Sequence, residues 1–187
     1  MDDKDKFIIK LALMGDTGTG KTIFRDYLKG GLEELDFQHY MATNGATYMQ
    51  KKLLFKKNIF SLDIWDFSGR NIYERIGKFF YSNAQIIFMF YEQKNRETFE
   101  TAKRRLKSVK ENCLYDVILV LIANKYDLNL YSKKNDDIIT DEEALEFADE
   151  NNILYSHLSI LEKYSNGINE LFEKVIKEYI KVKNIEI

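Results

Sequence analysis

The chain has 187 residues, of which 45% are hydrophobic and 31% are charged, and its formal net charge is −2. This composition is typical of a soluble globular protein, and the charge gives no support for nucleic-acid binding through a basic surface. Its one cysteine, Cys113, cannot close an internal disulfide, so a cytoplasmic, reducing compartment is expected. The N-terminal "MDDKDK" is too acidic for a secretory signal peptide, and no glycine follows Met1 for N-myristoylation.

Strand-like and helix-like segments alternate along the chain, and we expect one domain over residues 1–187 because no linker or repeat divides it. Strands are predicted at residues 6–14, 46–55, 58–65, 84–91, 116–125 and 153–159. Helices are predicted from Lys21, across residues 97–113, from Thr140 and from about Gly167. The pattern predicts an α/β fold with a six-stranded, mostly parallel sheet, helices on both faces and ligands at the carboxyl ends of the strands. The strands at 46–55 and 58–65 are joined too closely for a crossover, so this pair is expected to be antiparallel.

The helix predicted at residues 97–113 has an apolar stripe at three- and four-residue spacing. Its "AKRRLKSVK" segment, residues 102–110, is basic. A basic binding patch is one interpretation, but a solvated helix face is the preferred one.

The stretch "GDTGTGKT" follows the first predicted strand and opens the first predicted helix, with the spacing G-x-x-x-x-G-K-[ST] of a phosphate-binding P-loop. Its glycines let backbone N–H groups surround phosphate oxygens, and the helix N-terminus adds partial positive charge. Lys21 is expected to reach the β- and γ-phosphates, and the Thr22 hydroxyl to bind Mg²⁺. The candidate phosphate-binding residues are Gly15, Asp16, Thr17, Gly18, Thr19, Gly20, Lys21 and Thr22.

The stretch "ANKYD" follows a buried strand and is the candidate base-binding loop. The Asp127 carboxylate can accept from both N1–H and the exocyclic amino group of guanine, whereas adenine offers no such pair of donors. Asn124 can tie the loop together, and the aliphatic stem of Lys125 can lie over the base. Taken alone, the pattern N-K-x-D is more often a surface turn. In a chain that also has a P-loop, and after a buried strand, it favours binding of guanine.

The stretch "WDFSG" ends the third predicted strand. Asp66 is expected to hold Mg²⁺, through water, and the Gly69 N–H to touch the γ-phosphate. The position of this loop would then depend on whether that phosphate is present.

With these motifs in this order, the chain resembles the Ras superfamily of small GTPases, and its Rab branch in particular, from Phe7 to about Val182. The stretches that carry the resemblance are "GDTGTGKT", "IWDFSGRN", "ANKYD" and "KFFYSNAQIIFMFY". It implies a P-loop G domain acting as a Mg²⁺-dependent GTP/GDP switch in vesicle traffic, with switch loops at about 36–47 and 66–80. It also implies that Thr43 closes on Mg²⁺ and the γ-phosphate. The alternative is that Thr43 is an ordinary surface-loop threonine, since Thr47 lies close by in the same segment. Ser159 and Ile160 would lie in the loop that reads the guanine oxygen, although the family has Ser-Ala-Lys where this chain has Ser-Ile-Leu.

Arg70 departs from the family, which usually has glutamine after the D-x-x-G glycine. Arginine has five donors and no acceptor, so it cannot orient the attacking water as glutamine does. It could add positive charge beside the γ-phosphate or lie in solvent, and both alternatives predict slow intrinsic hydrolysis. Rab activators commonly bring their own catalytic side chains, so stimulated hydrolysis stays open. The candidate catalytic residues are Lys21, Thr43, Gly69 and Arg70.

The resemblance implies a monomer that binds effector, exchange-factor and activator proteins through the switch surface. Rab tails usually carry prenylated cysteines, and none lies near the final "KVKNIEI". Peripheral association with endomembranes would therefore need a lipidated tail or a partner. Two rival functions stay open, a scaffold that binds GTP or GDP without hydrolysing it and a phosphotransferase that uses ATP.

Overall fold

The computed structural model describes residues 6–31, 35, 40–70, 81–113, 116–127, 138–160 and 166–187. The strands are β1 (Lys6–Gly15), β2 (Ala46–Phe55), β3 (Asn58–Phe67), β4 (Ile86–Glu92), β5 (Ile118–Asn124) and β6 (Leu154–His157). The helices are α1 (Lys21–Gly30), α3 (Arg96–Asn112), α4 (Asp141–Glu150) and α5 (Asn166–Val182). The predicted α/β architecture is confirmed, and each predicted strand and helix lies within a few residues of its expected bounds.

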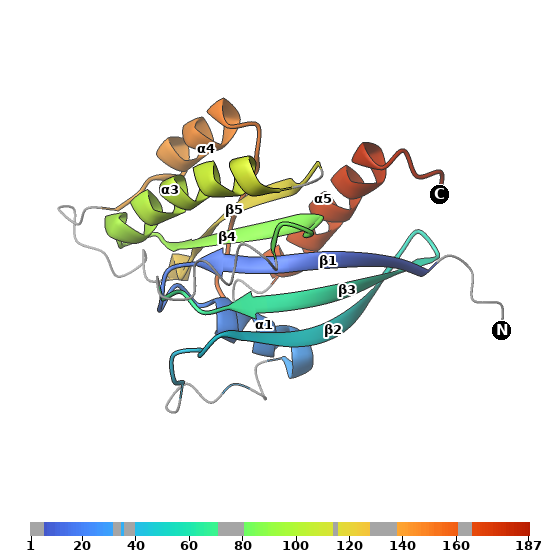
Figure 1. Ribbon diagram of the computed structural model, residues 1–187, viewed down its shortest axis with the longest axis horizontal. Coiled ribbons are helices and arrows are strands. Elements are labelled where there is room, and N and C mark those ends of the chain that lie inside the picture. The colour runs from blue at the N-terminus through green and yellow to red at the C-terminus, as the bar shows by residue number, and fades with distance from the viewer. Residues whose placement is uncertain are drawn as a thin grey trace.

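One six-stranded sheet runs in the order β2-β3-β1-β4-β5-β6 (Figure 1). β2 pairs antiparallel with β3, as its short turn predicts, and every other neighbouring pair is parallel. The chain leaves central β1 first toward β3 and then toward β4. The carboxyl end of β1 is therefore a topological switch point, where open α/β sheets bind their ligands.

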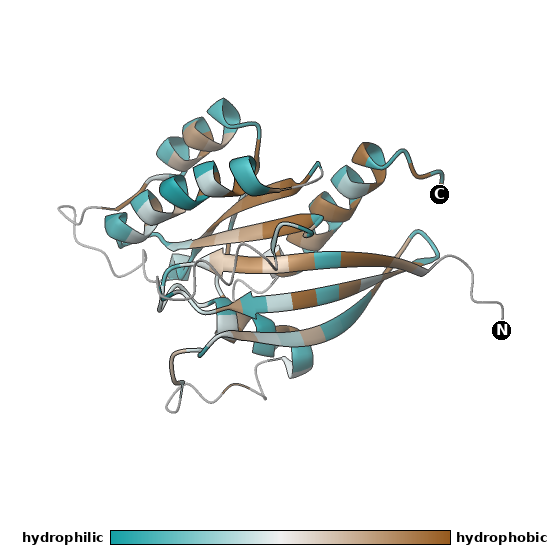
Figure 2. Ribbon diagram, viewed as in Figure 1, coloured by the Kyte–Doolittle hydropathy of each residue, from teal (hydrophilic) through white to brown (hydrophobic). Residues whose placement is uncertain are grey.

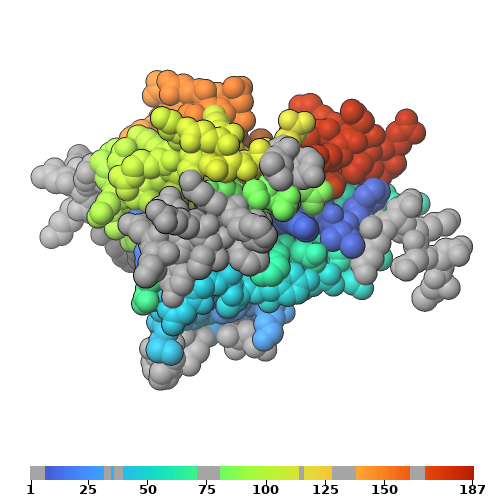
Figure 3. Space-filling model, in the orientation of Figure 1, coloured from blue at the N-terminus to red at the C-terminus, as the bar shows by residue number. Residues whose placement is uncertain are grey.

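Helices cover both faces of the sheet. α1 and α5 contribute to one buried apolar cluster, and α3 and α4 contribute to the other. Figure 2 shows the strands of the sheet centre as largely hydrophobic and the outer sides of the helices as hydrophilic. In Figure 3, α3 covers the upper part of the visible face and β2 lies along its lower edge. None of the helices in the described ranges is long and apolar enough to cross a membrane.

Phe24 fixes the helix that follows the P-loop. Its ring is fully buried and lies 6.0 Å from Phe88, 5.3 Å from Phe90 and 6.2 Å from Phe172 between ring centroids. Such aromatic contacts add to the stability gained from burial. Because Phe24 lies only three residues after Lys21, this packing also fixes the position of the C-terminal end of the P-loop relative to the sheet.

The solvated helix face predicted at residues 102–110 does not include Arg105. Arg104 is exposed, but Arg105 is only 8% exposed. Arg105 lies three residues after Ala102 and four before Val109, both of which are fully buried. It therefore belongs to the helical stripe that faces the sheet.

Candidate functional site

The P-loop joins the end of β1 to the start of α1 and surrounds the Lys21 ammonium. Lys21 Nζ donates to the carbonyl oxygens of Gly15 at 2.9 Å and Asp16 at 2.6 Å. Burial lowers the pKa of Lys21 to about 8; nearby Asp66 and Asp16 oppose the shift, and the positive charge of Arg105 adds to it. Carbonyl groups thus hold this buried cation in a loop whose sequence predicts phosphate binding.

The P-loop also contacts the candidate base-binding loop. Asn124 Nδ2 donates to the Thr19 carbonyl at 2.7 Å. Gly20, with φ of +93°, lies so close that a Cβ added there would be 2.2 Å from the same nitrogen. The loop that follows β5 is therefore tied directly to the loop that follows β1.

The predicted guanine-reading residues lie together at the ends of β5 and β6. The Ser159 hydroxyl donates to Asp127 Oδ1 at 2.6 Å, and the Tyr126 N–H donates to the Leu158 carbonyl at 3.1 Å. Lys125 pairs with Glu92 across 2.7 Å. Ser159 therefore orients the Asp127 carboxylate, while the neighbouring Ile160 is a buried apolar residue.

A cluster of oxygen atoms lies beside the start of α1. Thr22 Oγ1 donates to Asp66 Oδ2 at 2.7 Å and lies 2.8 Å from Thr43 Oγ1. Of the two threonines in the predicted switch I, the candidate Thr43 contacts Thr22, whereas the Thr47 hydroxyl accepts from Arg25.

This cluster fits a Mg²⁺ ion. The Asp66 side chain is fully buried, and its Oδ1 atom has no hydrogen-bond partner within the described ranges. Burial raises the pKa of Asp66, and the hydrogen bond from Thr22 and the charges of Lys21 and Arg25 oppose that shift. Hydroxyl and carboxylate oxygens are the ligands that Mg²⁺ prefers, so Thr22, Thr43 and Asp66 form a suitable set. In the same ranges no group of three or more His, Cys, Asp or Glu side chains could hold a metal.

Gly69 lies directly against the P-loop. A Cβ added to Gly69 would be 2.2 Å from the Thr17 nitrogen and 2.4 Å from the Asp16 carbonyl carbon. Arg105 of α3 contacts both segments. Its Nη2 donates to the Gly69 carbonyl at 3.0 Å and lies 3.8 Å from Asp16 Oδ1. Only glycine allows the two segments to approach so closely.

Arg70 is exposed, and its side chain is directed along the surface. Its Nη1 donates to Asn44 Oδ1 at 3.3 Å, and its N–H donates to Ser68 Oγ at 3.3 Å. The parts of the predicted switch loops at residues 36–39 and 71–80 lie outside the described residues.

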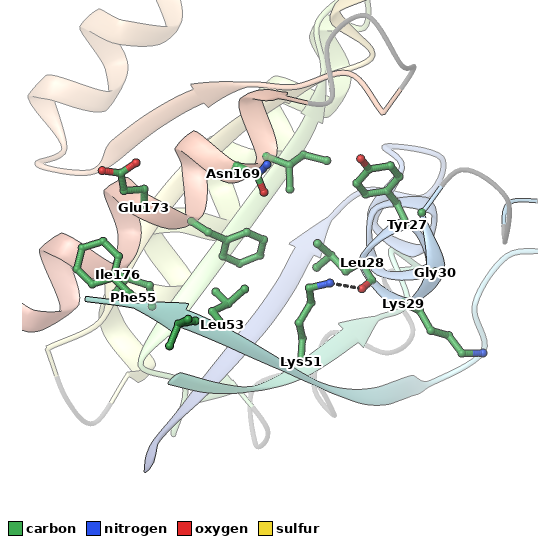
Figure 4. A pocket seen from close by; sticks show the side chains of 14 residues that line it. Tyr27, Leu28, Lys29, Gly30, Lys51, Leu53, Phe55, Asn169, Glu173 and Ile176 are labelled. Atoms are coloured by element: carbon green, nitrogen blue, oxygen red, sulfur yellow. Dashed lines mark hydrogen bonds between the residues drawn. The ribbon is translucent and has the colours of Figure 1, made fainter. Parts of the chain in front are cut away.

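Among the described residues, a smaller and a larger cavity adjoin α1, and the predicted site residues line the smaller one. A cavity of about 210 Å³ is lined by Thr17, Gly18, Gly20, Lys21, Thr22, Thr43 and Gly69, with Ile23, Tyr40, Met41, Ala42, Phe67 and Ser68. A larger cavity of about 580 Å³ lies between α1, β2 and α5, where Lys51 Nζ donates to the Leu28 carbonyl at 2.6 Å (Figure 4). The larger cavity contains no residue from the three motifs, so the smaller one is the candidate phosphate site.

Sequence reasoning missed two arginines at this site, Arg25 and Arg105. Arg25 lies three residues after Thr22, which places both on one side of α1. Arg105 could have been found from its place on the apolar stripe of α3. The spacing from Thr22 and the apolar stripe of α3 therefore pointed to these two positions, but neither arginine is part of a motif.

Comparisons with known proteins agree with this geometry. A family model described as "Ras family" matches residues 10–181, a range that includes every candidate site residue. The chain is also similar to the Ras-related protein Rab-5A of Dictyostelium discoideum, with 27% identity over 180 residues that cover 95% of this chain and 84% of that protein. The chain therefore belongs to the Ras family of small GTPases and is close to its Rab members.

Proposed function

We propose that this protein is a Rab-like guanine-nucleotide switch that depends on Mg²⁺ and hydrolyses GTP slowly. Membership of the Ras family implies binding of GTP and GDP. The proposal rests on one observation above others, the convergence of the P-loop, Thr43 and Asp66 beside α1. By the Rab resemblance, we extend it to a role in vesicle traffic, as a monomer that is read by effectors and acted on by exchange factors and activators.

Each group has a defined task in this proposal. Lys21 and the P-loop N–H groups bind the β- and γ-phosphates, and Asp127, oriented by Ser159, accepts hydrogen bonds from guanine. Thr22, Thr43 and Asp66 would hold Mg²⁺, which neutralises charge on the phosphate oxygens when it is bound. Gly69 offers its N–H to the γ-phosphate, so its contact with the P-loop changes with the nucleotide.

Slow hydrolysis follows from the chemistry of Arg70. Its side chain has no acceptor for a proton of the attacking water, and it donates to Asn44 instead. The remaining contributions to catalysis are positioning and charge, from Lys21 and the residues that hold Mg²⁺.

A single-turnover assay tests this function. Purified protein loaded with Mg·GTP should release phosphate slowly, and added cell extract that contains an activator should speed the release. Retention of GTP for hours with and without extract would instead favour a non-hydrolysing scaffold. Tight binding of ATP would favour the phosphotransferase alternative.

A further inference from the structure

Arg25 lies on α1 and directs its guanidinium into the cluster predicted to hold Mg²⁺. Its Nη1 lies 3.4 Å from Asp66 Oδ2 and also donates to the Thr47 hydroxyl. On its other side, Nε donates to Asp26 Oδ1 at 2.7 Å. The side chain is only 17% exposed. Contacts with α1, β2 and β3 therefore hold this cation in one place.

Arg25 and the predicted metal ion would share one carboxylate. Asp66 Oδ2 accepts from Thr22 and lies beside Arg25, whereas Oδ1 has no hydrogen-bond partner in the part of the chain that the structure describes. The Asp66 side chain is completely buried. Charges interact more strongly at a partly buried site than in water, so two cations on the same carboxylate influence each other.

We propose that the Arg25 guanidinium interacts with the same Asp66 carboxylate that would hold Mg²⁺. This positive charge slows loss of the nucleotide when Mg²⁺ is removed. This inference rests on the proposed guanine-nucleotide switch. Without Mg²⁺, the negative charge of Asp66 lies near the nucleotide phosphates and repels them, and the Arg25 guanidinium offsets this repulsion. With Mg²⁺ present, the same guanidinium opposes the ion and weakens its binding.

The test measures release of a fluorescent GDP analogue in Mg²⁺ and in EDTA. Arg25→Gln removes the charge and keeps a side chain that can still hydrogen-bond, whereas Arg25→Lys keeps the charge. The acceleration of release by EDTA should be about tenfold greater in Arg25→Gln than in the unchanged protein, because close charge pairs couple by at least this amount. Arg25→Lys should resemble the unchanged protein. Arg104→Ala is a control, because Arg104 is exposed on α3 and donates to Thr101.

A Mg²⁺ titration of the same complexes gives a second readout. The Mg²⁺ concentration that half-maximally slows GDP release should be several-fold lower in Arg25→Gln, because a competing positive charge has been removed. Circular dichroism establishes that the variants are folded before they are compared.

The outcomes separate this inference from the proposed function. If the unchanged protein binds GDP, and EDTA accelerates release equally in it and in Arg25→Gln, the inference is overturned and the proposed function stands. If the unchanged protein does not bind the GDP analogue, both are overturned.

Discussion

The side chain of Arg70 donates a hydrogen bond to the side-chain oxygen of Asn44 across 3.3 Å. Arg70 follows Gly69, and Asn44 follows Thr43, so the contact joins the segments that carry two of the predicted γ-phosphate contacts. The guanidinium is therefore held by switch I at the protein surface.

Replacing Arg70 with glutamine should raise the intrinsic rate of GTP hydrolysis. Glutamine supplies an acceptor for the attacking water, and correct positioning of a reactant changes rates by about ten- to a hundredfold. The rate is measured by single-turnover phosphate release. Arg70→Lys is the matched control, because it retains a positive charge without an acceptor and should stay slow. An unchanged or lower rate in Arg70→Gln would mean that Arg70 has a catalytic role of its own or that another group positions the water.

Replacing Gly69 with alanine should weaken binding of GTP analogues more than binding of GDP. The added Cβ would meet backbone atoms of Asp16 and Thr17 at 2.2–2.7 Å, so the Gly69 segment must move away from the P-loop. Overpacking of this kind costs about 1–3 kcal/mol, which predicts about a 5- to 150-fold loss of affinity for a GTP analogue. Gly167→Ala is the control, because an added Cβ there meets its nearest atoms at 3.6 and 3.7 Å. Equal effects on GDP and GTP analogues would argue against a γ-phosphate-sensing role for Gly69.

Replacing Arg105 with alanine should lower the free energy of unfolding by about 1–3 kcal/mol, since a hydrogen bond from a buried charged group to the Gly69 carbonyl is lost. Urea unfolding measures the change. Arg104→Ala removes the neighbouring exposed arginine and should alter stability by less than about 0.5 kcal/mol. If both variants were equally stable, the contact between α3 and Gly69 would have no energetic importance.

Affinity for GDP should fall as the pH rises above about 8. Lys21 has its pKa lowered to about 8 in the nucleotide-free protein, so it is charged below that pH and increasingly neutral above it. Phosphate groups bind the charged form, so affinity should fall by up to about tenfold per pH unit above 8. Fluorescence titrations at pH 7, 8 and 9 measure this slope. The Lys21→Arg variant keeps its positive charge throughout this range. Any pH dependence of GDP affinity that remains in this variant therefore comes from other titratable groups. An equal slope in both proteins would contradict the assignment to Lys21.

The sequence was sufficient to predict the fold and the place of the three candidate loops at one edge of the sheet, because their signals are local. "GDTGTGKT" and "ANKYD" each follow a buried strand, and parallel strands bring their carboxyl ends to one edge. The short "KKN" turn was enough to predict that β2 and β3 are antiparallel, and their pairing confirms it.

The contacts that Arg25, Arg105 and Arg70 make could not be predicted in this way. Arg105 contacts Gly69, which is 36 residues away in sequence, and Arg70 contacts Asn44, which is 26 residues away. Composition alone places arginine on a solvated surface, whereas packing of α3 against the sheet buries Arg105. These contacts depend on how the elements pack together, which no single stretch of sequence specifies.

The central claim is that the chain binds guanine nucleotides through Asp127, and competition against a fluorescent GDP analogue tests it most directly. GDP and GTP should displace the analogue and ATP should not, while Asp127→Asn should weaken GDP binding strongly because an amide has only one acceptor atom. Displacement by ATP as effective as that by GDP, or unchanged GDP affinity in Asp127→Asn, would contradict the account.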